Sequence, residues 1–86
     1  MQFFAEKDLP NQSSNALRKG MRNLEKEIEE HRDKLKNPQK YEANWGAMNE
    51  KARNGLLKHW NKEINNFYES IENRIEELKK RGEWNE

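Results

Sequence analysis

Apolar residues recur every three or four positions in two long stretches of the chain. The first stretch contains Leu17, Met21, Leu24, Ile28, His31 and Leu35 at such positions. The second contains Ala52, Leu56, Trp60, Ile64, Phe67, Ile71, Ile75 and Leu78. Because steps of three and four place side chains on one face of an α-helix, the pattern predicts two helices that each bury one face.

Capping residues mark the ends of both predicted helices. Ser13 or Ser14 suits the start of the first helix, because a serine hydroxyl can accept a hydrogen bond from a free amide of the first turn. Pro38 ends that helix, since proline pushes the preceding residue out of the helical conformation. Asn49 suits the start of the second helix and Gly82 its end.

The expected fold is therefore all-α, an antiparallel two-helix hairpin with helices at about 14–36 and 49–81. A tryptophan-containing loop connects the helices, and residues 1–13, with Leu9-Pro10 and a run of Asn, Gln and Ser, form an irregular linker or anchor segment. Residues 14–86 then make up the helical domain. In this hairpin we expect His31 to lie opposite the level of Leu56 and Trp60.

The second helix is the longer one, so its far end needs a further cover. That end carries Ile75 and Leu78. Phe3, Phe4 and Leu9 are the candidates within the chain. A partner protein or a second copy of the chain is the alternative, so an oligomer is one expectation.

Composition narrows the class of protein. Of the 86 residues, 38% are charged and 31% are apolar, which gives a thin core, but the apolar residues are periodic and so favour a folded domain. The net charge of +1 does not suggest a dedicated nucleic-acid binder. The absence of cysteine excludes disulfides and thiolate metal sites. No apolar run approaches the roughly 18 residues that span a bilayer, and the N-terminal segment lacks the pattern of a signal peptide.

Three residues are candidates for acid–base chemistry. His31 lies on the apolar stripe, where it is either a half-buried structural histidine or a general base. His59 and Glu63 are one helical turn apart, so the carboxylate can orient the imidazole or share a metal ion with it. With no second ligand pair at matching spacing, we expect no metal site, and nothing in the sequence indicates a cofactor.

A basic and aromatic group surrounds the predicted loop. Lys34, Lys36 and Lys40 lie close in sequence to Tyr41 and Trp45, and such a group can stack a base and hold a phosphate. The nearby acidic residues weigh against nucleic-acid binding. Both Trp45 and Trp60 also fit simple core positions.

The order and spacing of several short motifs resemble a helical module found at the C-terminal ends of bacterial polymorphic toxins. These toxins include Rhs-repeat and filamentous-haemagglutinin-like proteins. The motifs are the strings 24–31 and 59–64 with the residues between them, and the pattern is carried by His31, Asn37, Pro38, Trp45, Trp60 and Glu63.

The resemblance implies an antibacterial effector that serves interbacterial competition. A secretion system would deliver it as part of a larger polypeptide, it would act in the cytoplasm of the target cell, and a cognate immunity protein would neutralise it. Its target would be an intracellular protein or nucleic acid, reached by binding or by nuclease activity, so whether it is an enzyme stays open. His31, His59 and Glu63 are the catalytic candidates.

The candidate binding residues are Lys34, Tyr41, Trp45 and Trp60. The alternative function is a non-toxic helical module for protein–protein interaction or assembly. Such a module would not inhibit growth on expression, and it would form an oligomer in a concentration-dependent way.

Overall fold

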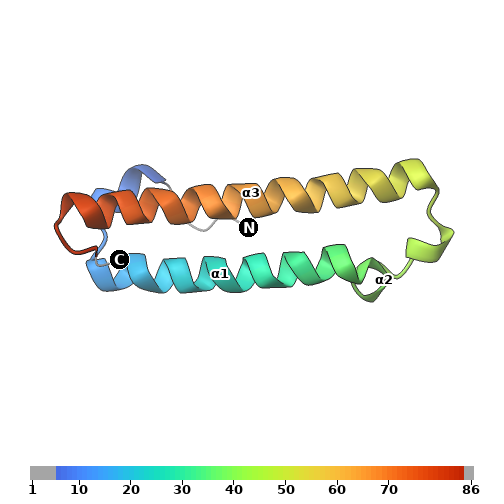
Figure 1. Ribbon diagram of the computed structural model, residues 1–86, viewed down its shortest axis with the longest axis horizontal. Helices are drawn as coiled ribbons and strands as arrows, with labels where there is room; N and C mark the ends of the chain where they lie inside the picture. Colours follow the sequence, from blue (N-terminus) through green and yellow to red (C-terminus); the bar gives the residue numbers. More distant parts are fainter. Residues whose placement is uncertain (1–5, 85–86) are drawn as a thin grey trace.

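The computed structural model describes residues 6–84, and its regular elements are all helical. Two long helices, α1 (Ser14–Lys36) and α3 (Glu50–Lys80), run antiparallel along a rod of 51 × 21 × 18 Å (Figure 1). Between them lie the short helix α2 (Pro38–Tyr41) and a 3-10 turn at Trp45–Ala47. A further 3-10 helix, Glu6–Asn11, precedes α1. The predicted all-α hairpin is confirmed.

The caps at the starts of the two long helices explain why their boundaries could be predicted. The hydroxyl of Ser13 accepts a hydrogen bond from the amide of Ala16 at 3.1 Å, and Oδ1 of Asn49 accepts one from the amide of Ala52 at 2.8 Å. Each bond satisfies an amide that has no partner within its own helix.

The end of α3 is closed by Gly82. Its φ of 70° lies in the left-handed region, which glycine adopts without steric cost. The amide of Gly82 donates to the carbonyl of Lys79 at 3.0 Å, and that of Glu83 donates to the carbonyl of Leu78 at 2.9 Å. This pair of bonds is the Schellman motif, which satisfies carbonyls at a helix C-terminus.

The core is the seam between the two long helices, meaning the side chains packed between α1 and α3. Its buried apolar members are Leu17, Met21, Leu24, Ile28, Trp60, Ile64 and Leu78. At the end of the hairpin away from the loop, Leu9 joins Leu17, Met21 and Leu78, and Trp84 packs against this group. Leu9 therefore covers the far end of α3 as expected, while Phe3 and Phe4 lie outside the described residues.

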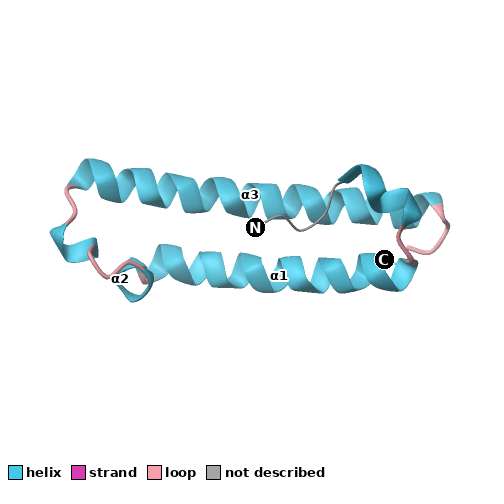
Figure 2. Cartoon of the chain, turned by 180° about the vertical axis from the view of Figure 1, so that it is seen from behind, coloured by secondary structure: helices cyan, strands magenta, loops and turns pink. Residues whose placement is uncertain are grey.

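The stripe of α3 departs most clearly from the predicted one at two positions, while Leu56, Phe67, Ile71 and Ile75 are partly buried. Ala52 is exposed, because the first turns of α3 lie beyond the last turn of α1 (Figures 1 and 2). Arg74 is fully buried, three residues after Ile71 and four before Leu78, and so occupies a regular seam position. Its Nη1 donates to the carbonyl of Ser70 at 2.8 Å.

The register of the hairpin also differs from the expected one. His31 contacts Glu63 and Phe67, which lie farther from the loop than the expected level of Leu56 and Trp60. The connection is the reason: α2 and the turn at Trp45–Ala47 carry the chain along the rod before α3 begins (Figure 1). None of the described helices is long and apolar enough to cross a membrane.

Candidate functional site

The three residues predicted to be catalytic meet at one carboxylate oxygen. Oε1 of Glu63 lies 3.2 Å from Nε2 of His31 and 3.2 Å from Nε2 of His59. His31 reaches it from the seam face of α1, whereas His59 precedes Glu63 by one turn of α3. The pairing of His59 with Glu63 follows from local spacing, but the contact with His31 requires the hairpin.

His31 has both ring nitrogens engaged inside the molecule. Its side chain is 5% exposed, and the ring meets Phe67 edge-on at a centroid distance of 5.0 Å. Nδ1 lies 2.8 Å from the backbone carbonyl of Glu27, which can only accept, so Nδ1 carries a proton. Nε2 faces the carboxylate of Glu63. His31 therefore has no nitrogen left for a substrate.

The second ring nitrogen of His31 links the two long helices. Nε2 lies 3.2 Å from Oε1 of Glu63, so this contact joins the buried imidazole of α1 to a side chain of α3 across the seam.

His59 is the accessible one of the two imidazoles. Its side chain is 61% exposed, and Glu63 engages only Nε2 of the ring. The carboxylate can thereby fix the ring orientation and leave Nδ1 for an external group, which is the arrangement of a general base. If the chain catalyses a reaction, His59 is the residue placed to move the proton.

No metal centre is formed in the part of the chain that the structure describes. Among residues 6–84, no three His, Asp or Glu side chains are grouped so as to hold a metal ion. The group of His31, His59 and Glu63 is instead joined by hydrogen-bonding distances.

Asp33, which sequence reasoning missed, organises the end of α1. Its carboxylate accepts hydrogen bonds from Tyr41 Oη, from Asn37 Nδ2 at 2.9 Å and from Lys40 Nζ at 3.2 Å. These donors, Tyr41 first, lower the pKa of Asp33 from 3.8 to about 2. The same contacts raise the pKa of Lys40 and of Tyr41. The only local signal was the spacing of Asp33 and Asn37, one turn apart.

Three of the four predicted binding residues, Lys34, Tyr41 and Trp60, lie close together, and Tyr41 joins them to Asp33. Nζ of Lys34 lies 5.8 Å from the ring centroid of Tyr41 and 5.8 Å from that of Trp60. Trp60 is buried and belongs to the core, while Tyr41 is 37% exposed. Lys40 lies 5.5 Å from the ring of Tyr41. The cations therefore cover ring surface that a base would need for stacking.

Trp45, the fourth predicted binding residue, contacts α3 instead. The guanidinium of Arg53 lies 5.2 Å from the centroid of its ring, and Nε of Arg53 donates to its backbone carbonyl at 2.9 Å. A second donor of the same arginine reaches the carbonyl of Gly46 at 3.3 Å. Trp45 therefore fastens the loop to α3, through an arginine that sequence reasoning did not single out.

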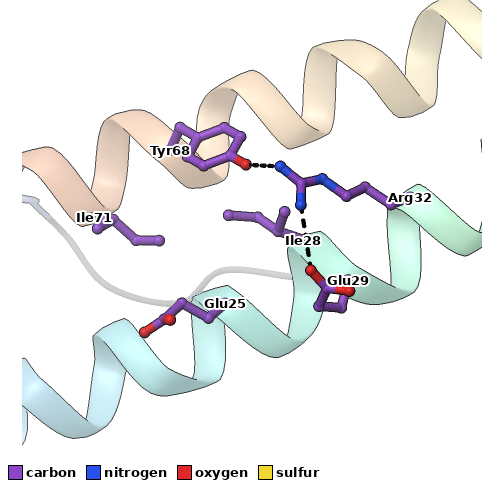
Figure 3. Close-up of a pocket in the computed structure, with 6 residues that line it drawn as sticks. All are labelled: Glu25, Ile28, Glu29, Arg32, Tyr68 and Ile71. Carbon is purple, nitrogen blue, oxygen red and sulfur yellow. Dashed lines mark hydrogen bonds and ion pairs between the residues drawn. The ribbon is translucent and has the colours of Figure 1, made fainter.

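A shallow groove between α1 and α3 is lined without either imidazole (Figure 3). Arg32 crosses it, donating to the hydroxyl of Tyr68 and to Glu29 at 3.3 Å. Ile28 and Ile71 also line the groove, and its volume of about 210 Å³ is below the range of about 300–1,000 Å³ typical of small-molecule sites. The groove is too small to enclose a ligand of ordinary size.

In comparisons with protein-family models, with curated proteins and with solved structures, no match to the chain was found.

Proposed function

We propose that the chain is an antibacterial effector domain of the polymorphic-toxin type that acts by binding a macromolecule in the recipient cell. The observation that carries the proposal is the contact between His31 and Glu63. These two residues belong to separate motifs of the resemblance, 32 positions apart, and they meet at 3.2 Å across the seam. The spacing of the motifs thus has a physical reason, because both are needed to form one internal contact.

Binding fits the site better than nuclease activity does. His31 has no free ring nitrogen, and Glu63 is shared between two imidazoles. Of the two imidazoles only that of His59 is open to solvent, so His59 is the residue through which a catalytic version of the proposal would act.

The biological setting follows from the resemblance. The domain would form the tip of a larger polypeptide, would enter a competing bacterium and would act in its cytoplasm. The producing cell would be protected by a cognate immunity protein that covers the active surface.

Growth inhibition is the direct test of this proposal. The chain is expressed from a tightly controlled promoter in a bacterium that lacks an immunity protein. We expect growth to stop, and we expect His59→Ala, confirmed to be folded by circular dichroism, to stop it equally. Loss of inhibition in folded His59→Ala would favour catalysis or a specific contact by that ring. Normal growth with the soluble, folded chain would reject an effector role.

A second candidate, a non-toxic helical assembly module, is favoured by one observation. Phe67, Ile71 and Ile75 are only partly buried along α3, so a further helix could cover them. This candidate predicts normal growth on expression and a molar mass by light scattering that rises with concentration. The two candidates therefore differ in both measurements.

A further inference from the structure

The first half of α3 carries a row of lysines on the side of the helix that faces away from α1. Lys51, Lys58 and Lys62 are separated by seven and four residues, which places them on one face of the helix. The same helical geometry puts them opposite Trp60, which is buried in the seam. All three lysines are exposed.

The residues around these lysines are polar but not acidic. The stretch from Lys51 to Lys62 contains no Asp or Glu. The exposed neighbours on this side of the helix are Asn54, Gly55, Asn61, Asn65 and Asn66. We call the three lysines and these neighbours the basic face.

The small net charge of the chain conceals this distribution. Residues 34–62 contain six lysines and one arginine against two acidic residues, Glu42 and Glu50. The carboxylates at the two borders of this range, Asp33 and Glu63, are already held by internal partners. A net charge of +1 for the whole chain is therefore compatible with a strongly positive loop end.

We propose that the basic face binds nucleic acid through the phosphate backbone. Lysine and asparagine side chains are among the usual donors to phosphate oxygens. Protein–protein interfaces, by contrast, are depleted in lysine and built around buried aromatic and apolar residues, and the basic face offers neither. The chemistry of the face thus favours a polyphosphate over a protein surface.

This inference rests on the proposed function and deepens it by naming nucleic acid as the target class. It is tested separately from growth inhibition, with the purified full chain and fluorescence anisotropy. The probes are a labelled single-stranded RNA and a labelled DNA duplex, which distinguish the two sources of phosphate, together with labelled poly-glutamate as an acidic polypeptide. A lack of nucleic-acid binding would reject this inference alone, because the effector role is supported or rejected by the growth assay.

The decisive comparison is between two double variants with equal net charge. Lys58→Glu with Lys62→Glu alters the basic face, whereas Lys19→Glu with Lys26→Glu alters exposed positions of α1. We expect the first pair to weaken nucleic-acid binding by about tenfold or more and the second to have a much smaller effect. The binding constant K falls as the salt concentration rises. Each of Lys58→Gln and Lys62→Gln should make the slope of log K against log salt concentration less steep by about one.

Three outcomes would overturn the inference. One is that neither nucleic acid binds at low salt. Another is that both double variants lose binding equally, which would show a dependence on total charge alone. The third is that poly-glutamate binds as tightly as the nucleic acids, which would assign the face to an acidic protein. Circular dichroism of every variant, with the two glutamine substitutions as the milder changes, separates loss of binding from loss of folding.

Discussion

His31 and Glu63 meet across the seam with unequal access to water. The two side chains lie 3.2 Å apart, yet that of His31 is 5% exposed and that of Glu63 is 36% exposed. The imidazole therefore depends on the carboxylate for its Nε2 hydrogen bond, whereas the carboxylate can return to solvent. Removing one partner should have a different effect from removing the other.

Glu63→Ala should destabilise the fold. It leaves Nε2 of His31 buried without its hydrogen-bond partner, and an unsatisfied buried polar group costs about 1–3 kcal/mol. Glu69→Ala, at an exposed position of the same helix, is the control and should change the free energy of unfolding by less than about 0.5 kcal/mol. Urea denaturation followed by circular dichroism measures both.

His31→Leu should cost less than Glu63→Ala, because leucine fits the apolar seam and the freed carboxylate stays hydrated. Equal losses in these two variants would contradict the asymmetry of the pair. So would a Glu63→Ala protein as stable as its control.

The contrast between local and non-local features explains what the sequence could predict. Helix ends follow from side chains that bond within one turn, as Ser13 and Asn49 do. The pairing of His59 with Glu63 is local in the same way. Its extension to His31 depends on the register between helices, which the connection of residues 37–49 sets by its own folding.

Charged residues in structural positions were also not predicted from the sequence. Arg74 occupies a seam position, but a search for apolar periodicity assigns that turn to Ile75 instead. Asp33 and Arg53 fasten the loop through hydrogen bonds to residues up to eight positions away. Such contacts depend on loop geometry, and residue type alone does not reveal them.

The stability of the hairpin should fall at low pH in part because of Asp33. The pKa of its carboxyl group is lowered from 3.8 to about 2 in the folded chain, so between these values the unfolded chain binds more protons. The stabilisation is therefore present above about pH 4 and is lost as the pH falls through about 2. Asp33→Asn should flatten this part of the stability profile, measured by thermal unfolding across the acid range.

Tyr41→Phe tests the cause of the Asp33 shift. The hydroxyl of Tyr41 makes the largest contribution to lowering that pKa. Its removal should move the pKa of Asp33 up toward 3.8, as followed by NMR titration of the carboxyl carbon. Tyr68→Phe, which alters a tyrosine bonded to Arg32 instead, is the control and should leave that titration unchanged. If the pKa of Asp33 is unchanged in Tyr41→Phe, the hydrogen bonds from Asn37 and Lys40 are its main cause instead.

Two glycines should respond to alanine in opposite directions. Gly55 lies inside α3, and a Cβ there would meet nothing within 4 Å, so Gly55→Ala should stabilise the fold by about 0.5–1 kcal/mol. Gly82 has open space too, but its φ is 70°, so Gly82→Ala should destabilise by about 1 kcal/mol. Melting temperatures that move in the same direction for both variants would refute this explanation.

The last prediction concerns Arg81, which ties three segments together at the open end of the hairpin. Its guanidinium donates to the carbonyl of Leu9 at 3.0 Å, to the hydroxyl of Ser14 at 3.2 Å and to the carboxylate of Glu77 at 3.1 Å. Arg81→Ala should cost about 1–3 kcal/mol, since bonds made by a charged donor are the stronger ones. Lys80→Ala, at the exposed neighbouring position, should cost far less.

Hydrogen exchange can locate the effect of Arg81→Ala. The amide of Gln12 donates to the carbonyl of Leu9 at 3.1 Å, so it should exchange faster once the anchor is lost, while amides in the middle of α1 keep their protection. Arg81→Lys separates geometry from charge, because a single ammonium cannot reach three acceptors in the fixed fork of a guanidinium. Arg81→Lys should therefore behave like Arg81→Ala, and full protection of Gln12 in Arg81→Lys would show that charge alone holds this end closed.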